Sequence, residues 1–192
     1  MTIGKDGTER NFTWYANTKE KGKFEFAKLN AEKDFKDAKV LDATVIEETN
    51  KDGFSSNSVT LEGLKPDTEY MYRFSNGDAF SEVKTFKTGG KGDFSFFAAG
   101  DPQIGAGFED EDEKGWDKTL KLLPELDPSA SFLLSLGDQV NISDNERQYD
   151  AYINRDGFNG LTLAPIIGNH DSGNHAYTEH FKVCLLYTSP SP

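Results

Sequence analysis

The sequence has few cysteines, few histidines and no long apolar run. It contains one cysteine and three histidines in 192 residues. The single cysteine, Cys184, excludes an intramolecular disulfide framework. No run approaches the roughly 18 apolar residues that a membrane-spanning helix needs, and the first residues lack the apolar core of a signal peptide. We therefore expect a folded, soluble chain that carries no targeting segment.

Basic residues are also few. Lysine and arginine total 21 against 33 aspartate and glutamate residues, which gives a formal net charge of −12. Binding to nucleic acid or to an anionic membrane needs a positive surface, so neither is expected as the main partner. A small phosphorylated substrate is still compatible with this charge, because a bound metal ion can reverse the sign of the local field.

The first half of the sequence predicts an all-β sandwich. Short alternating, β-branched or aromatic segments recur about every ten residues, and turn residues such as Asn76-Gly77 separate them. This spacing is typical of a β-sandwich. The predicted strands cover residues 12–15, 23–28, 43–47, 58–61, 70–75 and 80–87. The predicted domain ends at residue 88, and Trp14 is expected in its core.

A Gly-rich linker at residues 88–93 leads to a part with a different pattern. Because the linker is short, the two domains are expected to touch. Three apolar runs, at residues 94–99, 131–136 and 161–167, predict three further strands. The first run is almost continuously apolar, as expected for a strand that is buried on both faces.

Two helices are predicted between these three strands. Apolar residues at helical spacing predict an amphipathic helix over residues 114–126, with Trp116 in the core. The acidic run at 109–113 is either a solvated loop or the first turn of this helix. Ser143 and Glu146 match a capping box at the start of the second helix. Alternating strands and helices are typical of an open α/β sheet with parallel strands.

Each of the three strands ends in a glycine that is followed at once by a carboxylate or a carboxamide. The three sites are Gly100-Asp101, Gly137-Asp138 and Gly168-Asn169-His170-Asp171. In open α/β sheets, ligands bind beyond the carboxyl ends of the strands. Aspartate and asparagine oxygens suit Mg, Mn, Fe or Zn, and one carboxylate can bridge the two ions of a two-metal hydrolase. A neighbouring histidine could donate a hydrogen bond or a proton to a phosphate or its leaving group.

These motifs resemble two known families. The pattern Leu61-x-Gly-Leu-x-Pro-x-Thr-x-Tyr70 resembles the tyrosine corner of fibronectin type III-like domains, which makes Tyr70 structural. The three strand ends resemble the first three motif blocks of the calcineurin-like metallophosphoesterases, and the preceding sandwich narrows the match to the purple acid phosphatase branch. The resemblance implies a fibronectin type III-like sandwich at residues 1–88 and the N-terminal half of an α/β metallophosphoesterase domain at residues 93–182.

The resemblance also implies roles for individual residues. Asp101 would bind the first metal ion, Asp138 would bridge two ions, and Asn169 would bind the second. His170 would contact the phosphate or protonate the leaving group, and Asp171 would orient His170 or its loop. The cofactors would be two divalent or trivalent ions, Fe, Zn or Mn. The substrate would be a small phosphorylated molecule, and the location would be secreted or at the cell surface.

The sequence departs from the family pattern at two places. The family places an iron-binding tyrosine three residues after the bridging aspartate, but this sequence has Asn141 there, so ferric iron and a purple colour are not expected. Three metal-binding histidines from later blocks have no counterpart. His175 and His180 are expected on a loop or helix surface, and Gln103 either reaches the site or caps its loop.

The last ten residues, 183–192, lack charge and end in Ser-Pro repeats. They resemble translated sequencing-adapter readthrough, so the native sequence is expected to stop near residue 181 or 182; a natural disordered tail is the alternative. The chain would then be an inactive, C-terminally truncated piece of an acid phosphatase. Two other functions compete with this hypothesis: a phosphodiesterase or nucleotidase of the same superfamily, and a non-catalytic surface binding protein with a vestigial phosphatase half.

Overall fold

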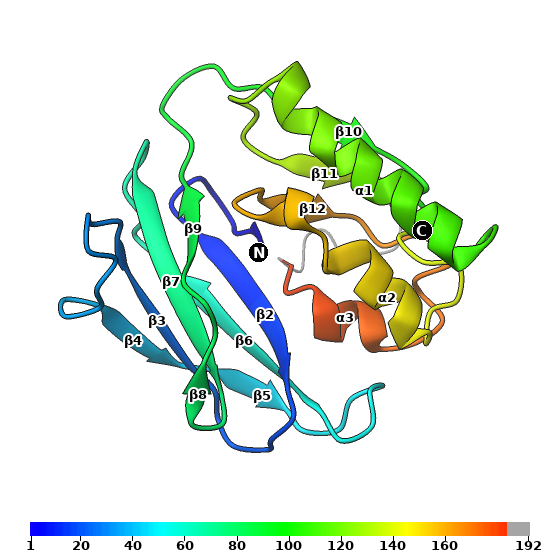
Figure 1. Cartoon of the computed structure of the whole chain (residues 1–192), viewed down its shortest axis with the longest axis horizontal. Coiled ribbons are helices and arrows are strands. Elements are labelled where there is room, and N and C mark those ends of the chain that lie inside the picture. Colours follow the sequence, from blue (N-terminus) through cyan, green and yellow to red (C-terminus); the bar gives the residue numbers. More distant parts are fainter. Residues whose placement is uncertain (184–192) are drawn as a thin grey trace.

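The computed structural model describes residues 1–183, so the predicted tail lies outside the described residues from residue 184 onward. The described part is mostly β-sheet with few helices, and Figure 1 shows a β-sandwich beside an α/β layer. The strands of the first part are β1 (Thr2–Ile3), β2 (Arg10–Ala16), β3 (Lys23–Lys28), β4 (Lys39–Asp42), β5 (Thr44–Ile46), β6 (Ser55–Leu61), β7 (Glu69–Asn76), β8 (Ala79–Phe80) and β9 (Lys84–Lys87). Within the described residues, no helix is both long and apolar enough to cross a membrane.

The sandwich packs two antiparallel layers around an aromatic core. Strands β1, β2, β6 and β5 form one layer, and β4, β3 and β7 with its partners β8 and β9 form the other. Alternate side chains of β2 point inward. The Phe12 ring therefore packs in a tilted geometry against Phe24 and Tyr72 across the core, with ring centroids 4.7 Å and 4.8 Å apart. Trp14 is buried there, as predicted. The predicted strand at 80–87 is wrong in its extent, because residues 81–83 interrupt it between β8 and β9.

The predicted tyrosine corner is present. The backbone N–H of Lys65 donates to the hydroxyl of Tyr70 across 2.9 Å, and the Tyr70 ring is buried and stacks on Phe86. The hydroxyl therefore anchors the corner that precedes β7, which is a structural role.

The second part alternates strands and helices as predicted. Its elements are β10 (Phe97–Ala99), α1 (Glu109–Leu126), β11 (Leu133–Ser135), α2 (Glu146–Ile153), a 3₁₀-helix (Asp156–Phe158), β12 (Leu163–Pro165) and α3 (Ala176–His180). Strands β10, β11 and β12 are parallel neighbours, with Phe97 beside Leu133 and Leu133 beside Leu163. Their carboxyl ends therefore lie at one edge of the sheet, as the three glycine-ending strands predicted.

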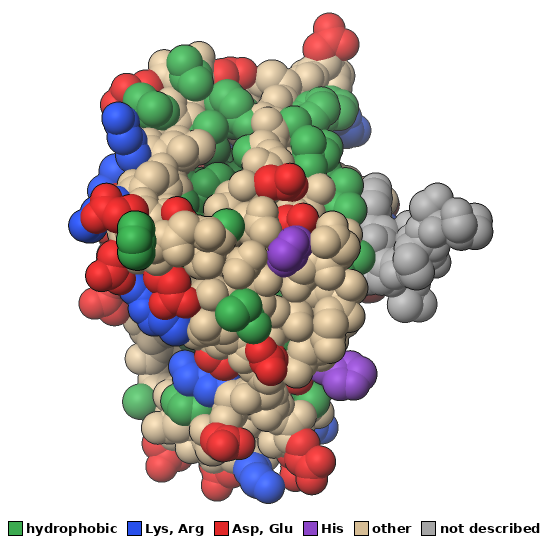
Figure 2. Space-filling model, turned by 90° about the vertical axis from the view of Figure 1, so that its right-hand side faces the viewer, with side chains coloured by type: hydrophobic (Ala, Val, Ile, Leu, Met, Phe, Trp, Pro, Cys, Tyr) green, Lys and Arg blue, Asp and Glu red, His purple; other side chains and the backbone are tan. Residues whose placement is uncertain are grey.

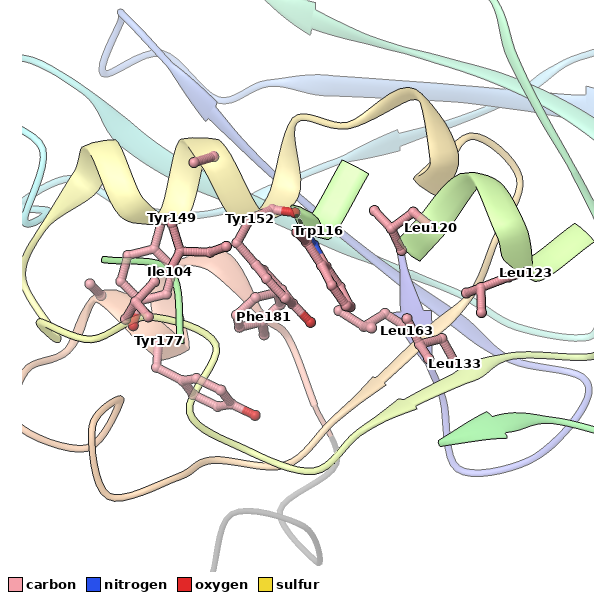
Figure 3. Close-up of a cluster of buried hydrophobic side chains, with 13 residues drawn as sticks. Ile104, Trp116, Leu120, Leu123, Leu133, Tyr149, Tyr152, Leu163, Tyr177 and Phe181 are labelled. Carbon is pink, nitrogen blue, oxygen red and sulfur yellow. Dashed lines mark hydrogen bonds between the residues drawn. The ribbon is translucent and has the colours of Figure 1, made fainter. Parts of the chain in front are cut away.

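Helices α1 and α2 cover one face of these strands. Figure 3 shows Trp116 lying flat against Tyr152, with their ring centroids 5.2 Å apart, and the indole N–H donates to the Tyr152 carbonyl. The acidic run forms the first turn of α1, where negative charge suits the helix dipole. The predicted capping box is wrong: Asn145, not Ser143, caps α2 by accepting from two backbone N–H groups.

Part of the opposite face of these strands is exposed, which corrects the prediction for residues 94–99. Only three of those residues form β10, and Phe94 and Phe96 are 66% and 47% exposed. Strand alternation places Phe96 on the face away from the helices, where its ring stacks on Phe132 at 5.0 Å. Figure 2 views the side of the molecule that lies on the right in Figure 1, and exposed hydrophobic side chains gather in the upper part of this view.

One short strand joins the two parts. Thr2 in β1 pairs in parallel with Leu163 in β12 and antiparallel with Asn11 in β2. The result is a single seven-stranded sheet with the order β10-β11-β12-β1-β2-β6-β5. Figure 1 shows the N-terminus between the two parts, beside β12 and β2. The two parts therefore share backbone hydrogen bonds as well as side-chain contacts.

Side chains close the same interface between β2 and α3. The buried Glu179 carboxylate accepts from the Tyr15 hydroxyl at 2.7 Å and from the Asn50 backbone N–H at 2.9 Å. His180 stacks on Tyr149 at 4.5 Å, and its Nε2 lies 3.1 Å from Glu146. The prediction of a surface position is therefore wrong for His180, because these contacts leave its side chain 12% exposed. His175 is exposed, as predicted.

Candidate functional site

The loops that follow β10, β11 and β12 are hydrogen-bonded to one another. The backbone N–H of Gln103 donates to the Asp138 carbonyl at 2.8 Å, and that of Ile104 donates to Gln139 at 3.2 Å. The third loop joins them where the His170 N–H donates to Oδ1 of Asp138 at 2.9 Å. Asp138 therefore lies at the meeting point of all three loops.

Two glycines allow this close approach. A Cβ atom on Gly168 would lie 2.1 Å from Oδ1 of Asp138 and 2.2 Å from its backbone nitrogen. Gly137 has φ of 103° and faces the Gly168 backbone, so it needs the conformational freedom that only glycine has. The glycine before each polar residue is thus required where β11 and β12 end.

The backbone is unusual at two of the three predicted metal ligands. Asp101 and Asp138 both have φ of 47°, and Gln103 has φ of 36°. A residue with a Cβ in this left-handed region costs on the order of 1 kcal/mol or more, and such strain clusters at functional sites. Aspartate tolerates it better than most residues. The strained positions coincide with two residues that the sequence singled out.

Asp171 holds two of the loops together. Its side chain is fully buried. One carboxylate oxygen accepts from the N–H groups of Gln139 and Val140, at 2.9 and 3.3 Å, and the other accepts from Gly168 at 2.8 Å. Burial raises the pKa of this carboxyl group, and the three N–H donors oppose that shift. These hydrogen bonds all join Asp171 to loop backbone. Of the two alternative roles predicted for Asp171, orienting His170 or orienting the loop, they are of the second kind.

The His170 ring is held between two residues of the other loops. Its Nδ1 lies 2.8 Å from the carbonyl oxygen of Asn141, and its Nε2 lies 3.1 Å from the side-chain nitrogen of Gln103. The same Gln103 nitrogen donates to Oδ1 of Asn141 at 3.1 Å. Gln103 therefore reaches the site. Sequence reasoning left this open, because the contact depends on the left-handed backbone at Gln103.

Several oxygen atoms at these loops have no hydrogen-bond partner among residues 1–183. They belong to the carboxylate of Asp101, to Oδ2 of Asp138 and to the exposed side chain of Asn169. Such hard oxygen donors fit ions such as Mg, Mn, Fe or Zn. Within the described residues, no three His, Cys, Asp or Glu side chains are grouped so as to hold an ion. The described residues therefore present individual oxygen donors at these loops, without a group of three such side chains around one point.

A cleft lies elsewhere in the molecule. It has a volume of about 560 Å³ and separates the sandwich from α2 and α3, with Trp14, Tyr15, Glu146 and His180 among its lining residues. None of the five predicted site residues lines it. The predicted site residues on the three loops therefore lie outside this cleft.

Comparisons with known proteins agree with this fold. The model of the purple acid phosphatase N-terminal domain matches residues 1–88. The fold is similar to that of a purple acid phosphatase from yellow lupin (Lupinus luteus) seeds, with a TM-score of 0.69 and 15% identity over 93% of this chain. It is also similar to the structure of PhoD, with a TM-score of 0.55 and 16% identity over 86% of this chain. The chain covers 38% and 40% of the lengths of these two proteins. No curated protein matches the sequence.

Proposed function

We propose that the protein is a metal-dependent phosphoesterase, because residues 1–88 match the purple acid phosphatase N-terminal domain. The finer proposal is hydrolysis of phosphate monoesters of the acid phosphatase type, at a two-metal site. The 192-residue chain would supply only part of that site, since it spans 38% of the lupin enzyme.

One observation carries the proposal. The carboxyl-end loops of three adjacent parallel strands meet at Asp138, and the two aspartates proposed as ligands share the same left-handed φ of 47°. Asp67 in the sandwich has the same φ, so the φ value alone does not single out the site. The meeting of the loops brings two left-handed aspartates to one sheet edge, and such backbone strain clusters at functional sites. The α/β half of the chain is, in this proposal, the N-terminal half of a metallophosphoesterase domain.

The chain's own residues have distinct proposed roles. Asp101 would hold one ion, Asp138 would bridge two, and Asn169 would hold the other, with the neutral amide adding no negative charge near an anionic substrate. His170 would contact the phosphate or the departing oxygen. Asp171 would keep the second and third loops at a fixed separation through its three backbone hydrogen bonds.

Metal ions bound there would polarise the phosphoryl group and lower the pKa of a water molecule. Fe, Zn and Mn all suit oxygen ligands of this kind. Asn141 contacts Gln103 through its side chain and His170 through its carbonyl oxygen. Because an amide replaces the phenolate expected at that position, a ferric ion with purple colour is not proposed.

The proposal extends to substrate and location. The substrate would be a small phosphorylated molecule, with neither nucleic acid nor a membrane as partner, and the protein would act outside the cell or at its surface. A non-catalytic binding protein is the competing proposal. It is favoured by the lack, among residues 1–183, of any three His, Cys, Asp or Glu side chains grouped to hold an ion.

The test uses the reading frame recovered downstream of residue 182 and compares the extended protein with the 192-residue chain. We expect metal-dependent hydrolysis of an aryl phosphate by the extended protein and little or none by the 192-residue chain. D138N should remove turnover and the loading of two ions, whereas D144N, at an exposed aspartate nearby, should leave both unchanged.

Full activity of D138N would refute the site assignment. Absence of metal-dependent turnover in the extended protein, with every monoester and diester tested, would favour the binding protein.

A further inference from the structure

The proton on the neutral His170 ring can be assigned to one nitrogen. Nδ1 lies 2.8 Å from the backbone carbonyl oxygen of Asn141. A carbonyl oxygen can only accept a hydrogen bond, so Nδ1 must carry the hydrogen. In a neutral imidazole the other nitrogen then has a lone pair and no hydrogen. Nε2 of His170 is therefore an acceptor.

The partner of Nε2 fits this assignment. The Gln103 side-chain nitrogen lies 3.1 Å from Nε2 of His170 and 3.1 Å from Oδ1 of Asn141. An amide NH₂ group has two hydrogens to donate, and here each hydrogen has one acceptor. The Asn141 carbonyl determines that Nδ1 carries the hydrogen and that Nε2 carries the lone pair. The Gln103 amide must therefore turn its NH₂ group, and not its oxygen, toward Nε2.

The position of Gln103 is itself set by the loops. Its backbone N–H donates to the carbonyl of Asp138 at 2.8 Å, and its φ is 36°. The next residue, Ile104, is fully buried and continues the contact with the loop after β11. Gln103 therefore touches the bridging-ligand candidate through its backbone and His170 through its side chain.

We infer that Gln103 is a positioning residue, which acts together with the Asn141 carbonyl to hold His170 as the Nδ1–H tautomer with the Nε2 lone pair facing the amide. The inference deepens the proposed function, on which its catalytic meaning rests. In this state His170 offers no N–H at Nε2. Donation from Nε2 to a phosphate or a departing oxygen therefore requires a second proton on the ring, as well as release of that nitrogen by the Gln103 amide.

The experiment is ¹⁵N NMR of the histidine ring nitrogens in the 192-residue chain, at an alkaline pH where imidazoles are neutral. For His170 we expect a protonated Nδ1 and an unprotonated Nε2. The exposed His175 is the internal reference. An Nε2–H tautomer of His170 in the wild-type chain would overturn the inference without any variant. The measurement needs neither metal nor turnover, so its failure is distinct from failure of the proposed phosphatase function.

Two variants test the role of the side chain. Q103L removes both donors and should shift the tautomer ratio about five-fold toward Nε2–H, which corresponds to one net hydrogen bond. Q103E has nearly the same shape but presents only acceptors, so it should favour the Nε2–H tautomer of the neutral ring. A merely structural role would lower the melting temperature and leave the ring nitrogens of the folded chain unchanged. Wild-type ring spectra in both variants would therefore overturn the inference.

Discussion

The substitution Asp171→Asn tests how the second and third loops are held together. Asparagine keeps the shape of the side chain but has one oxygen in place of two. In its best orientation the oxygen keeps the donors Gln139 and Val140, and the NH₂ group then faces the N–H of Gly168. In the variant, the NH₂ group of the new asparagine would face the Gly168 N–H, which is also a donor. In the wild type, a carboxylate oxygen accepts from that N–H.

The size of the effect follows from these contacts. Each hydrogen bond to a charged group contributes about 1.5–3 kcal/mol to stability. One such bond is lost and two become weaker, while burying a neutral amide costs less than burying a carboxylate, whose pKa burial raises. We expect a net loss of about 2 kcal/mol, which lowers the melting temperature of a chain of this size by about 4–8 °C.

The assay is thermal unfolding of the 192-residue chain, followed by circular dichroism. D144N is the matched control, because its exposed side chain should change stability by no more than about 0.5 kcal/mol. Hydrogen exchange should show faster exchange at the Gly168 amide in D171N. Equal melting temperatures for D171N and the wild type, with the Gly168 amide still protected, would refute the proposed role of this carboxylate.

Four further outcomes follow from the structure. Y70F removes the acceptor of a corner amide and should destabilise the chain by about 1 kcal/mol in urea unfolding. G168A should destabilise by about 1–3 kcal/mol, because its Cβ would overlap Asp138. G115A, whose Cβ meets nothing within 4 Å in helix α1, should stabilise by about 0.5–1 kcal/mol in the same assay. Burial raises the pKa of Tyr72 to about 12; because the unfolded side chain ionises first, near pH 10, stability should fall as the pH rises through this interval, which urea midpoints would measure.

The sequence predicted elements whose patterns are local. Hydrophobic periodicity placed β3 and α1, and the Leu61–Tyr70 pattern placed the tyrosine corner. Strand β4 was missed because it is short and mostly exposed, and its two apolar residues, Val40 and Leu41, are adjacent, so it has no apolar alternation to recognise. The capping box failed because α2 begins at Glu146 after its cap Asn145, so Glu146 is the first helical residue and not the third. It bonds to Asn50 of the sandwich and lies beside His180, which are partners that no local window contains.

The candidate site, too, was predictable from the sequence only in part. Glycine followed by a polar residue at three strand ends predicted that Asp101, Asp138 and the third loop lie at one sheet edge, because parallel strands bring their carboxyl ends together. The contact between Gln103 and His170 was not predictable, since it depends on a left-handed backbone and on residues 67 positions apart. The roles of these residues in metal binding stay predictions.

The two residues of β1 have a consequence for how the chain folds. Thr2 pairs with Leu163, so the sheet closes only when segments about 160 positions apart meet. Contacts this distant in sequence slow folding, because the entropy of closing the intervening chain is lost before any contact forms. During synthesis β12 is made long after β1 and β2. One edge of β1 can pair with β2 soon after both are made, whereas its other edge stays exposed to other chains until β12 arrives.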